Sequence, residues 1–316
     1  MRIGGISFLI SADSAIRLRI ANPLYHPFLA GEEIGEEFRE IKVQLKNDTW
    51  PQLDLKGTIF NTLDSWFIRR NGKDYWIHLA PPHLEEPLWI ARFGSRVQRV
   101  TVYCRSLQHK KSEKRIVNLP ITYPLDQLLL MVYLARRQGM LMHAAGMVHR
   151  ESAYLFAGAS GAGKSTFSEL LVKARTGKML SDERMIVREI GGKMIAFGTP
   201  WAGTAGIARD GSAPLAGIFF LKHGKSNRIE KLAASAAADR LLPMISIPWY
   251  DPDTAAPIIA FAKRVFAVAP AYEFRFTPDR TAIAFFWKFI KKNPDYFEPS
   301  KRSIQGNQPL VGVDMI

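Results

Sequence analysis

The chain has 316 residues, of which 47% are hydrophobic and 23% charged, a composition typical of a globular protein with one large domain or two smaller ones. Its single cysteine, Cys104, excludes an internal disulfide and a cysteine-based zinc site, and favours a reducing, cytoplasmic setting. We find no signal peptide at the start and no apolar run long enough to span a bilayer, so we expect no membrane span.

The formal net charge is +14, which favours polyanions, acidic peptides or anionic surfaces as partners. The same surplus fits a solvated basic surface on a protein that must also bind a polyphosphate, and we prefer this plainer interpretation. The densest basic cluster, residues 110–115, is predicted to be an exposed loop. No helix-turn-helix, zinc-finger or aromatic-interleaved basic pattern is found, so we expect no nucleic-acid partner.

Residues 1–120 predict a β-rich, antiparallel N-terminal domain whose role the sequence does not reveal. Hydrophobic and polar residues alternate along several short segments, which is typical of half-buried strands. The dipeptide Asn71-Gly72 lies between two of them and predicts a hairpin. The predicted strands are Ser14–Ile20, Trp66–Arg70, Tyr75–His78 and Val97–Tyr103.

Pro120 and Pro124 mark a boundary, after which residues 121–292 predict a second domain. An apolar stripe at helical spacing predicts a helix over residues 125–138, which Gly139 ends. Two apolar runs, residues 140–148 and 153–157, then predict a hairpin of buried strands.

The second strand of this hairpin leads into the pattern G-x-x-x-x-G-K-[ST] at residues 158–165, and Thr166 and a helical pattern follow it. Glycines in such a loop let successive backbone N–H groups turn toward phosphate oxygens, and the N-terminus of the next helix adds a positive field. We expect Lys164 to reach the β- and γ-phosphates and the Ser165 hydroxyl to bind Mg²⁺. A glycine-rich turn that binds nothing is the less favoured alternative. The predicted nucleotide-binding residues are Gly158, Ala159, Ser160, Gly161, Ala162, Gly163, Lys164, Ser165 and Thr166.

Two acids, Asp182 and Glu183, end the next predicted strand, 18 positions after Lys164. A carboxylate at a strand end beside a phosphate-binding loop can bind Mg²⁺ or take a proton. The alternative is a pair of acids that only caps a turn. The short interval predicts that this strand follows the loop's helix directly.

Two further features remain open on the residues alone. His143 lies in the middle of a predicted strand, where a histidine is more often a packed residue than a functional one. Residues 198–203, Gly-Thr-Pro-Trp-Ala-Gly, predict an irregular loop that either walls an active site or is a rigid turn around a buried Trp201.

The remaining sequence alternates helical and strand patterns, which makes the chain α+β or α/β. From Asn293 onward, proline, glycine and polar residues predict a loose tail, residues 293–316. The predicted elements are a hairpin over 185–197, a strand over 216–221, helices over 230–242 and 254–268, a strand over 271–276 and a helix over 277–292.

Three segments in order, His143-Ala-Ala-Gly146, the loop 158–166 and Leu180-Ser-Asp-Glu183, resemble the HPr serine kinase/phosphorylase family. Tyr123-Pro-Leu-Asp-Gln127 and Gly198-Thr-Pro-Trp201 make the sequence most similar to the HPr-kinase-related proteins. The resemblance covers about residues 120–275. It implies a P-loop kinase domain of the HPr kinase/PEP carboxykinase type over residues 121–292, which uses ATP or another nucleoside triphosphate with Mg²⁺.

The resemblance also implies roles for individual residues. Lys164 would stabilise the phosphates, and Asp182 would be the general base on a substrate serine, with His143 beside it to tune its pKa. Ser165, Asp182 and Glu183 would hold Mg²⁺. Glu183 replaces the family's second aspartate and Thr166 stands where an acid is usual, so the resemblance does not identify HPr as the acceptor.

The sequence therefore predicts a Mg-ATP-dependent kinase that phosphorylates a hydroxyl, serine in the first place, of a protein, peptide or small molecule. The basic charge suits an acidic acceptor, and the resemblance allows a homo-oligomer. The alternative is a non-catalytic nucleotide-binding scaffold or sensor. A mechanochemical NTPase is the least favoured hypothesis, because the acidic pair follows the loop too closely.

Overall fold

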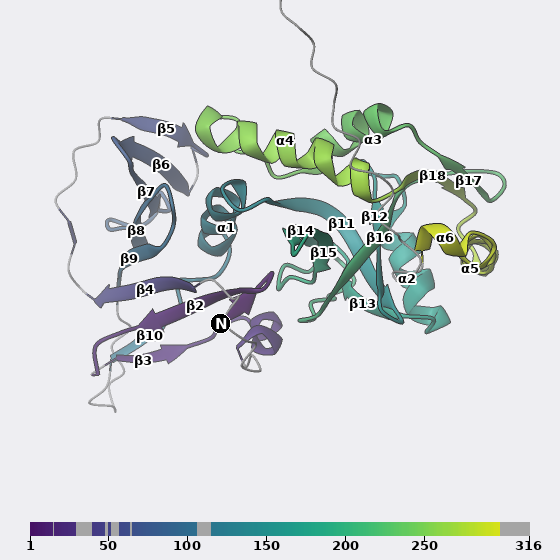
Figure 1. Ribbon diagram of the computed structural model, residues 1–316. Helices are drawn as coiled ribbons and strands as arrows, with labels where there is room; N and C mark the ends of the chain where they lie inside the picture. The colour runs from purple at the N-terminus through teal and green to yellow at the C-terminus, as the bar shows by residue number, and fades with distance from the viewer. Residues whose placement is uncertain are drawn as a thin grey trace, which may run out of the picture.

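The computed structural model describes residues 1–14, 16–29, 40–47, 50–51, 57–63, 65–105 and 115–297. The fold is mixed α/β: two large sheets lie side by side, with helix α1 (Leu125–Ala135) between them and helix α4 (Pro252–Val268) running along one edge of both (Figure 1). The predicted basic loop falls outside the described residues except for Arg115, and so does the predicted tail beyond Phe297.

The N-terminal sheet has the order β1-β2-β4-β9-β8-β7-β6-β5. The hairpin predicted at Asn71-Gly72 is confirmed, since β6 and β7 pair antiparallel around Gly72, whose φ is 57°. The sheet is not wholly antiparallel as predicted, because β4 pairs parallel with both β2 and β9. Alternation along a strand indicates which face is buried, but it does not indicate the direction of the partner strand. The elements of this part are β1 (Arg2–Ile3), β2 (Ile6–Ser11), β4 (Glu40–Asn47), β5 (Thr58–Asn61), β6 (Trp66–Asn71), β7 (Asp74–Leu79), β8 (Trp89–Gly94) and β9 (Arg99–Cys104), with a 3₁₀ turn at Pro23–Phe28 and a parallel pair of β3 (Ile16–Arg19) with β10 (Arg115–Asn118).

The inner face of this sheet packs against α1. Every second residue of β4 and β9 is buried, including Val43 and Val100, and these side chains share one apolar cluster with Leu129 and Tyr133 of the helix. The cluster extends to Ile186, beyond the predicted boundary at residue 120. The apolar stripe that predicted α1 is thus buried between the N-terminal strands and elements of the second sheet, β11 and α4 among them.

The second sheet is organised by two long strands, β11 (Gly139–His149) and β16 (Ser212–His223). The first half of β11 pairs with β14, and its second half pairs with β12. In the same way β16 pairs first with β15 and then with β12 and β18. The strand that leads into the glycine-rich loop, β12, therefore lies between the two long strands. The other members are β12 (Ser152–Ala157), β13 (Lys178–Ser181), β14 (Arg184–Ile190), β15 (Lys193–Phe197), β17 (Arg228–Lys231) and β18 (Ala271–Phe276).

Helices cover both faces of this sheet. On one face α2 (Lys164–Ala174), α5 (Arg280–Lys292) and α6 (Pro294–Phe297) enclose an aromatic cluster that includes Phe156 and Phe167. On the other face α3 (Ala234–Leu241) and α4 pack on Leu155 and Ile218. The loop between β12 and α2 is thus supported from both faces.

Three element boundaries differ from the predictions. The predicted helix 125–138 ends at Ala135, because the chain turns back with Gln138 at a φ of 50°. The predicted helix 230–242 begins only at Ala234, since β17 occupies residues up to Lys231. The loose tail predicted from Asn293 is wrong for residues 294–297, which form α6, and Phe297 is buried in the aromatic cluster.

Polar contacts also join the N-terminal strands to the second sheet and its helices. Arg70 forms salt bridges with Asp251 and Asp253 at the start of α4. Near the chain start, Arg2 pairs with Asp210, and Arg188 donates to the carbonyl oxygen of Gly4. The division at residue 120 remains a prediction.

Candidate functional site

The glycine-rich loop runs from the end of β12 to the start of α2. Gly161 and Gly163 have φ values of 78° and 94°, a region that other residues rarely adopt. A Cβ on Gly158 would lie 2.7 Å from the Cβ of Ala162, and one on Gly163 would lie 2.7 Å from the ring of Phe276. Backbone conformation therefore favours glycine at residues 161 and 163, and close packing requires it at residues 158 and 163.

Lys164, the first residue of α2, folds back over this loop. Its Nζ donates a hydrogen bond to the carbonyl oxygen of Gly158 at 2.7 Å. Burial lowers the pKa of the ammonium group, and the nearby carboxylate of Glu183 opposes this shift. Lys164 thus lies where it can reach both a phosphate on the loop and the acidic pair.

The two acids lie in the tight connection between β13 and β14. The hydroxyl oxygen of Ser181 accepts hydrogen bonds from the backbone N–H groups of Glu183 and Arg184, at 3.2 and 3.1 Å. The N–H of Ala144 on β11 donates to the carbonyl oxygen of Glu183 at 3.0 Å. These bonds fix the acidic pair against the strand that carries His143.

Asp182 is 5% exposed, and its carboxylate accepts three backbone hydrogen bonds. Oδ1 accepts from Gly203 at 2.9 Å and Ile207 at 3.2 Å, and Oδ2 accepts from Ala205 at 2.7 Å. A carboxylate has about four acceptor positions, so most of this group's capacity is used within the protein. Asp182 thereby holds residues 203–207 against the acidic pair.

The carboxylate of Glu183 has a different partner. Its Oε2 lies 3.3 Å from Nε2 of His143, and the two side chains are 32% and 36% exposed. Burial lowers the pKa of His143, the charge of Lys164 lowers it further, and Glu183 opposes both effects. A neutral imidazole can donate its Nε2–H to the glutamate. The resemblance paired His143 with Asp182, whereas the structure brings it into contact with Glu183.

The loop after β15 combines both alternatives that the sequence left open. Trp201 is buried, as expected of a rigid turn. Two residues later the chain reaches the acids: a Cβ on Gly203 would lie 3.0 Å from Oδ2 of Asp182 and 3.1 Å from Oε2 of Glu183. The loop therefore walls the site with a glycine backbone.

A buried polar cluster holds the beginning of this loop. The indole N–H of Trp201 lies 2.9 Å from Oδ2 of Asp126 and 3.1 Å from the hydroxyl of Tyr25, which itself donates to Asp126 at 2.7 Å. Burial raises the pKa of Asp126 to about 6, although hydrogen bonds from Tyr25 and Trp201 oppose the shift.

Sequence reasoning assigned no role to Tyr25 or Asp126. Asp126 belongs to the run Tyr123–Gln127, which entered only through the resemblance. A fully buried aspartate within an apolar helix is a signal that could have predicted a buried polar partner.

A cavity of about 650 Å³ lies beside the loop, and His143 is not among the residues that line it. Residues 158–162, the end of β16, Arg240, Met244 and Glu273 line it. Its volume is within the range of small-molecule sites. Arg240 is held at its edge by a hydrogen bond of 2.6 Å to Glu273.

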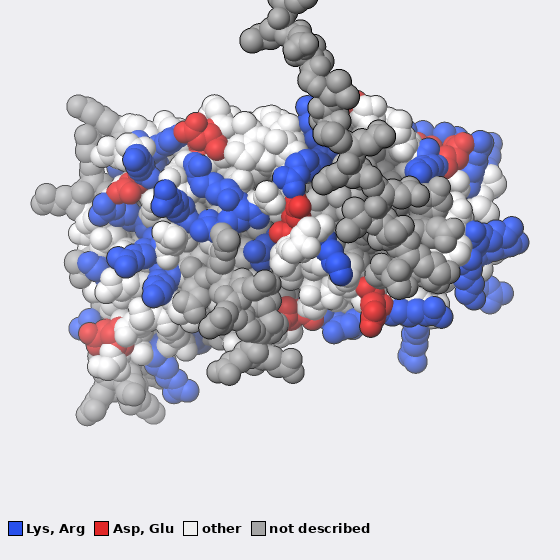
Figure 2. Space-filling model, viewed as in Figure 1, with Lys and Arg blue, Asp and Glu red and all other residues white. Residues whose placement is uncertain are grey.

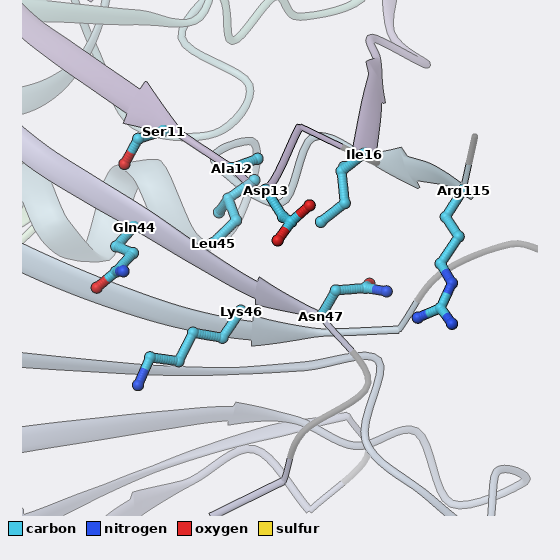
Figure 3. Close-up of a pocket in the computed structure, with 9 residues that line it drawn as sticks. All are labelled: Ser11, Ala12, Asp13, Ile16, Gln44, Leu45, Lys46, Asn47 and Arg115. Carbon is cyan, nitrogen blue, oxygen red and sulfur yellow. The ribbon is translucent and has the colours of Figure 1, made fainter. Parts of the chain in front are cut away.

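A second cavity, of about 710 Å³, lies in the N-terminal part between β2, β4, β3 and β10 (Figure 3). It is lined by polar side chains such as Asp13, Lys46 and Arg115, and none of the residues predicted for the nucleotide site lies there. The motif and the site geometry, rather than cavity size, therefore select the cavity beside the loop.

The oxygen-bearing side chains beside the loop suit Mg²⁺ that is bound together with a phosphate. The described residues contain no cluster of three or more metal-binding side chains. Mg²⁺ at phosphate sites usually takes one or two carboxylates, a hydroxyl, waters and phosphate oxygens. The exposed hydroxyl of Ser165 and the carboxylate of Glu183 fit that pattern without a dedicated cage.

Basic side chains lie at both ends of the face shown in Figure 2, over the N-terminal strands and near β17 and α5. Figure 2 shows more blue than red side chains where Figure 1 draws the N-terminal strands. Lys42 and Arg99 are exposed neighbours on β4 and β9, and Lys46 lies over the ring of Tyr103. Within the described ranges, no helix has the length and apolar character needed to cross a membrane.

The fold and the site define a mixed α/β protein with a glycine-rich strand–loop–helix and an acid–histidine contact beside it. A family model, SynChlorMet cassette protein ScmC, matches residues 102–251, slightly less than half of the chain. This segment includes the loop, His143 and both acids.

Among solved structures, the HPr(Ser) kinase/phosphatase from Coxiella burnetii is similar at 10% sequence identity, with a TM-score of 0.30. The match covers 49% of this chain and 98% of that chain. A likeness of this size does not by itself define a fold or an activity. No curated protein matches the chain.

Proposed function

We propose that this protein is a phosphotransferase that uses Mg-ATP, or another nucleoside triphosphate, to phosphorylate a hydroxyl group. The favoured acceptor is a serine of a protein or peptide, and a small-molecule hydroxyl is the other possibility. One observation carries the proposal: Lys164, Glu183 and His143, from three different elements, meet beside the glycine-rich loop. Nucleotide binding alone requires the loop and the lysine, but not an imidazole in contact with a carboxylate.

The loop and its surroundings supply the donor site. Backbone N–H groups of residues 158–163 and the N-terminus of α2 bind the phosphates, and Lys164 exchanges its bond to Gly158 for a phosphate oxygen. The cavity at Arg240 and Met244 takes the nucleoside. Ser165 and the acidic pair would hold Mg²⁺, which would supply positive charge beside the phosphates.

The region around His143 and the acidic pair takes the acceptor. A carboxylate there accepts the proton of the acceptor's hydroxyl group while the hydroxyl oxygen bonds to the γ-phosphorus. The bond from that phosphorus to the β,γ-bridging oxygen breaks, and the nucleoside diphosphate leaves. Residues 203–207 cover the acids and limit the access of water. The basic N-terminal surface suits an acidic acceptor.

Calorimetric titration with Mg-ATP tests the donor site. Wild type should bind ATP, and Lys164→Ala should lose at least about tenfold in affinity, because it removes the charge that contacts the phosphates. Lys173→Ala is the matched control, since Lys173 is an exposed lysine on the same helix. No binding to the wild type would contradict the proposal.

Transfer of a γ-labelled phosphate from ATP to candidate peptides then tests the chemistry. Labelling of a serine peptide by wild type, but not by Lys164→Ala, supports a kinase. Tight binding of Mg-ATP without transfer to any candidate would favour the nucleotide-binding scaffold instead.

A further inference from the structure

Two basic side chains end the strand that lies beside the glycine-rich loop. β16 pairs parallel with β12 up to the register of Ala157 with Phe220, so the next residues of β16 run alongside the loop. Lys222 and His223 are the last two residues of that strand, and both line the cavity beside the loop. The strand thus brings an ammonium group and an imidazole to the place where the loop and the cavity meet.

His223 packs directly on the last glycine of the loop. A Cβ on Gly163 would lie 2.8 Å from Cε1 and 3.0 Å from Nε2 of the imidazole. The imidazole also stands against Phe276 of β18, with ring centroids 5.4 Å apart. Gly163 is the N-cap of α2, and the first backbone N–H groups of a helix lack partners within the helix and attract anions. His223 therefore stands beside the helix end that binds phosphate in the proposed function.

Lys222 leaves the strand on the other face of the sheet, because successive side chains of a strand alternate between faces. Its neighbour on that face, Phe220, packs in the cluster under α3 and α4, whereas Leu221 packs in the aromatic cluster under α2. Lys222 thus points to the face that carries α3, where Arg240 and Met244 complete the cavity. This is the side on which the proposed function places the nucleoside.

Neither side chain is committed to a partner within the protein. Both are exposed, and among the residues that the structure describes, neither side chain forms a hydrogen bond or an ion pair. Arg240 in the same cavity is already paired with Glu273 at 2.6 Å. Among the described residues that line the cavity, Lys222 is thus the cation that a ligand can bind without breaking an ion pair.

We propose that Lys222 and His223 bind the phosphate chain of the donor from the strand side, as partners of the glycine-rich loop. The inference rests on the proposed function and extends its donor site to a strand for which the loop motif predicts no ligand. A nucleotide with its terminal phosphates at the N-terminus of α2 and its nucleoside in the cavity has a phosphate chain that passes the end of β16.

The two side chains contact different parts of that chain. His223 donates an imidazole N–H to a phosphate oxygen near Gly163, which an imidazole does in its neutral and its charged form. Lys222 lies nearer the nucleoside and binds the phosphate next to it through a charge-assisted hydrogen bond.

Calorimetric titration of the full-length protein with Mg-ATP and with inorganic tripolyphosphate tests Lys222. Lys222→Met keeps the length of the side chain and removes its charge, so the affinity for both ligands should fall by about tenfold, as for the loss of a charge-assisted hydrogen bond. Lys222→Arg should retain most of the affinity. Lys225→Met is the matched control, since Lys225 is an exposed lysine in the turn after β16.

The same titrations separate phosphate binding from packing at His223. His223→Leu keeps an apolar body against Gly163 and Phe276 but removes the donor, so the affinity for both ligands should fall by about fivefold. His223→Gln retains an N–H donor and should recover part of this loss. Equal affinity of wild type and both variants for tripolyphosphate would overturn the role of His223.

Four outcomes separate the inference from the proposed function. Wild-type affinity for both ligands in Lys222→Met and His223→Leu would overturn the inference and leave the proposed function standing. A loss for Mg-ATP without a loss for tripolyphosphate would also overturn it, because the side chains would then contact the nucleoside. Reduced affinity for both ligands, in a protein that transfers no phosphate to any acceptor, would support the inference and overturn the kinase. Wild type that binds neither ligand would overturn both.

Discussion

The indole N–H of Trp201 lies 2.9 Å from the carboxylate of Asp126, and this hydrogen bond joins the wall of the candidate site to helix α1. Asp126 also accepts the hydroxyl of Tyr25, whose oxygen in turn accepts the backbone N–H of Tyr123. The loop after β15 is therefore held at two places: by this cluster at Trp201 and by Asp182 further on. N-terminal residues take part in the first of them.

Removing the indole donor should destabilise the protein. Trp201→Phe keeps an aromatic ring but leaves the buried carboxylate with one donor fewer, so we expect a loss of about 1–3 kcal/mol in unfolding free energy. Denaturant unfolding measures this loss. In a double-mutant cycle with Asp126→Asn, the two losses should be non-additive.

The control is Trp287→Phe, because the indole nitrogen of Trp287 has no acceptor among the described residues. Trp287→Phe should lower the free energy of unfolding by less than Trp201→Phe does. Equal losses for the two variants, or additive losses in the cycle, would show that the hydrogen bond to Asp126 contributes little.

Asp126 should make stability depend on pH in a direction opposite to that of most aspartates. Its pKa is raised to about 6 by burial, so the folded state holds the proton more tightly than the unfolded state does. Its contribution is present at low pH and is lost as the pH rises from about 4 to about 6. The full change in the free energy of unfolding is on the order of 3 kcal/mol.

The measurement compares urea unfolding of wild type with that of Asp126→Asn between pH 4 and pH 7. As the pH rises, the free energy of unfolding of wild type should fall by this amount relative to that of the variant. The difference should then level off above about pH 6. A difference that is constant across the range would mean that folding does not raise the pKa of Asp126.

The loop after β15 also depends on a glycine at its first position. A Cβ on Gly198 would lie 2.1 Å from the backbone oxygen of Arg209, and backbone cannot move aside as a flexible side chain can. Gly198→Ala should therefore destabilise the protein by about 1–3 kcal/mol, as overpacking does. Thermal unfolding tests this. Gly94→Ala is the control, since its nearest neighbour would be 3.9 Å away, and a similar loss there would refute the steric explanation.

The nucleoside cavity can be tested by filling it. Met244→Trp places a larger side chain against the loop, so ATP affinity should fall by about tenfold or more, while affinity for inorganic tripolyphosphate should hardly change. Calorimetry with both ligands measures this, and Val172→Trp on an exposed position of α2 is the control. Equal losses for the two ligands would place the nucleoside elsewhere.

Local features of this chain were predictable from the sequence. The loop at residues 158–166, its flanking strand and helix, and the hairpin at Asn71-Gly72 all follow from residues that are close together in the chain. Their conformations depend on where glycines permit positive φ angles and on the spacing of apolar residues. Both the glycines and the spacing can be read from the sequence.

Contacts between distant segments were not predictable in the same way. No local pattern indicates that the amides of Gly203, Ala205 and Ile207 converge on Asp182, or that His143 contacts Glu183 rather than its neighbour. At a strand end the face on which a side chain lies changes with each residue, so the partner of His143 depends on where the strand stops. The parallel pairing of β4 escaped prediction for a related reason, since alternation carries no information about strand direction.

Helix α1 has a consequence for how this protein can be divided or recombined. Ten of its eleven residues are buried, and seven of them belong to the apolar cluster that the N-terminal strands share. A fragment that began at residue 121 would expose the part of this apolar surface that the strands cover, and would be prone to aggregate. Exchange of N-terminal halves between relatives, in evolution or by design, therefore has to keep the strand side chains that match α1 and the Tyr25 hydroxyl that matches Asp126.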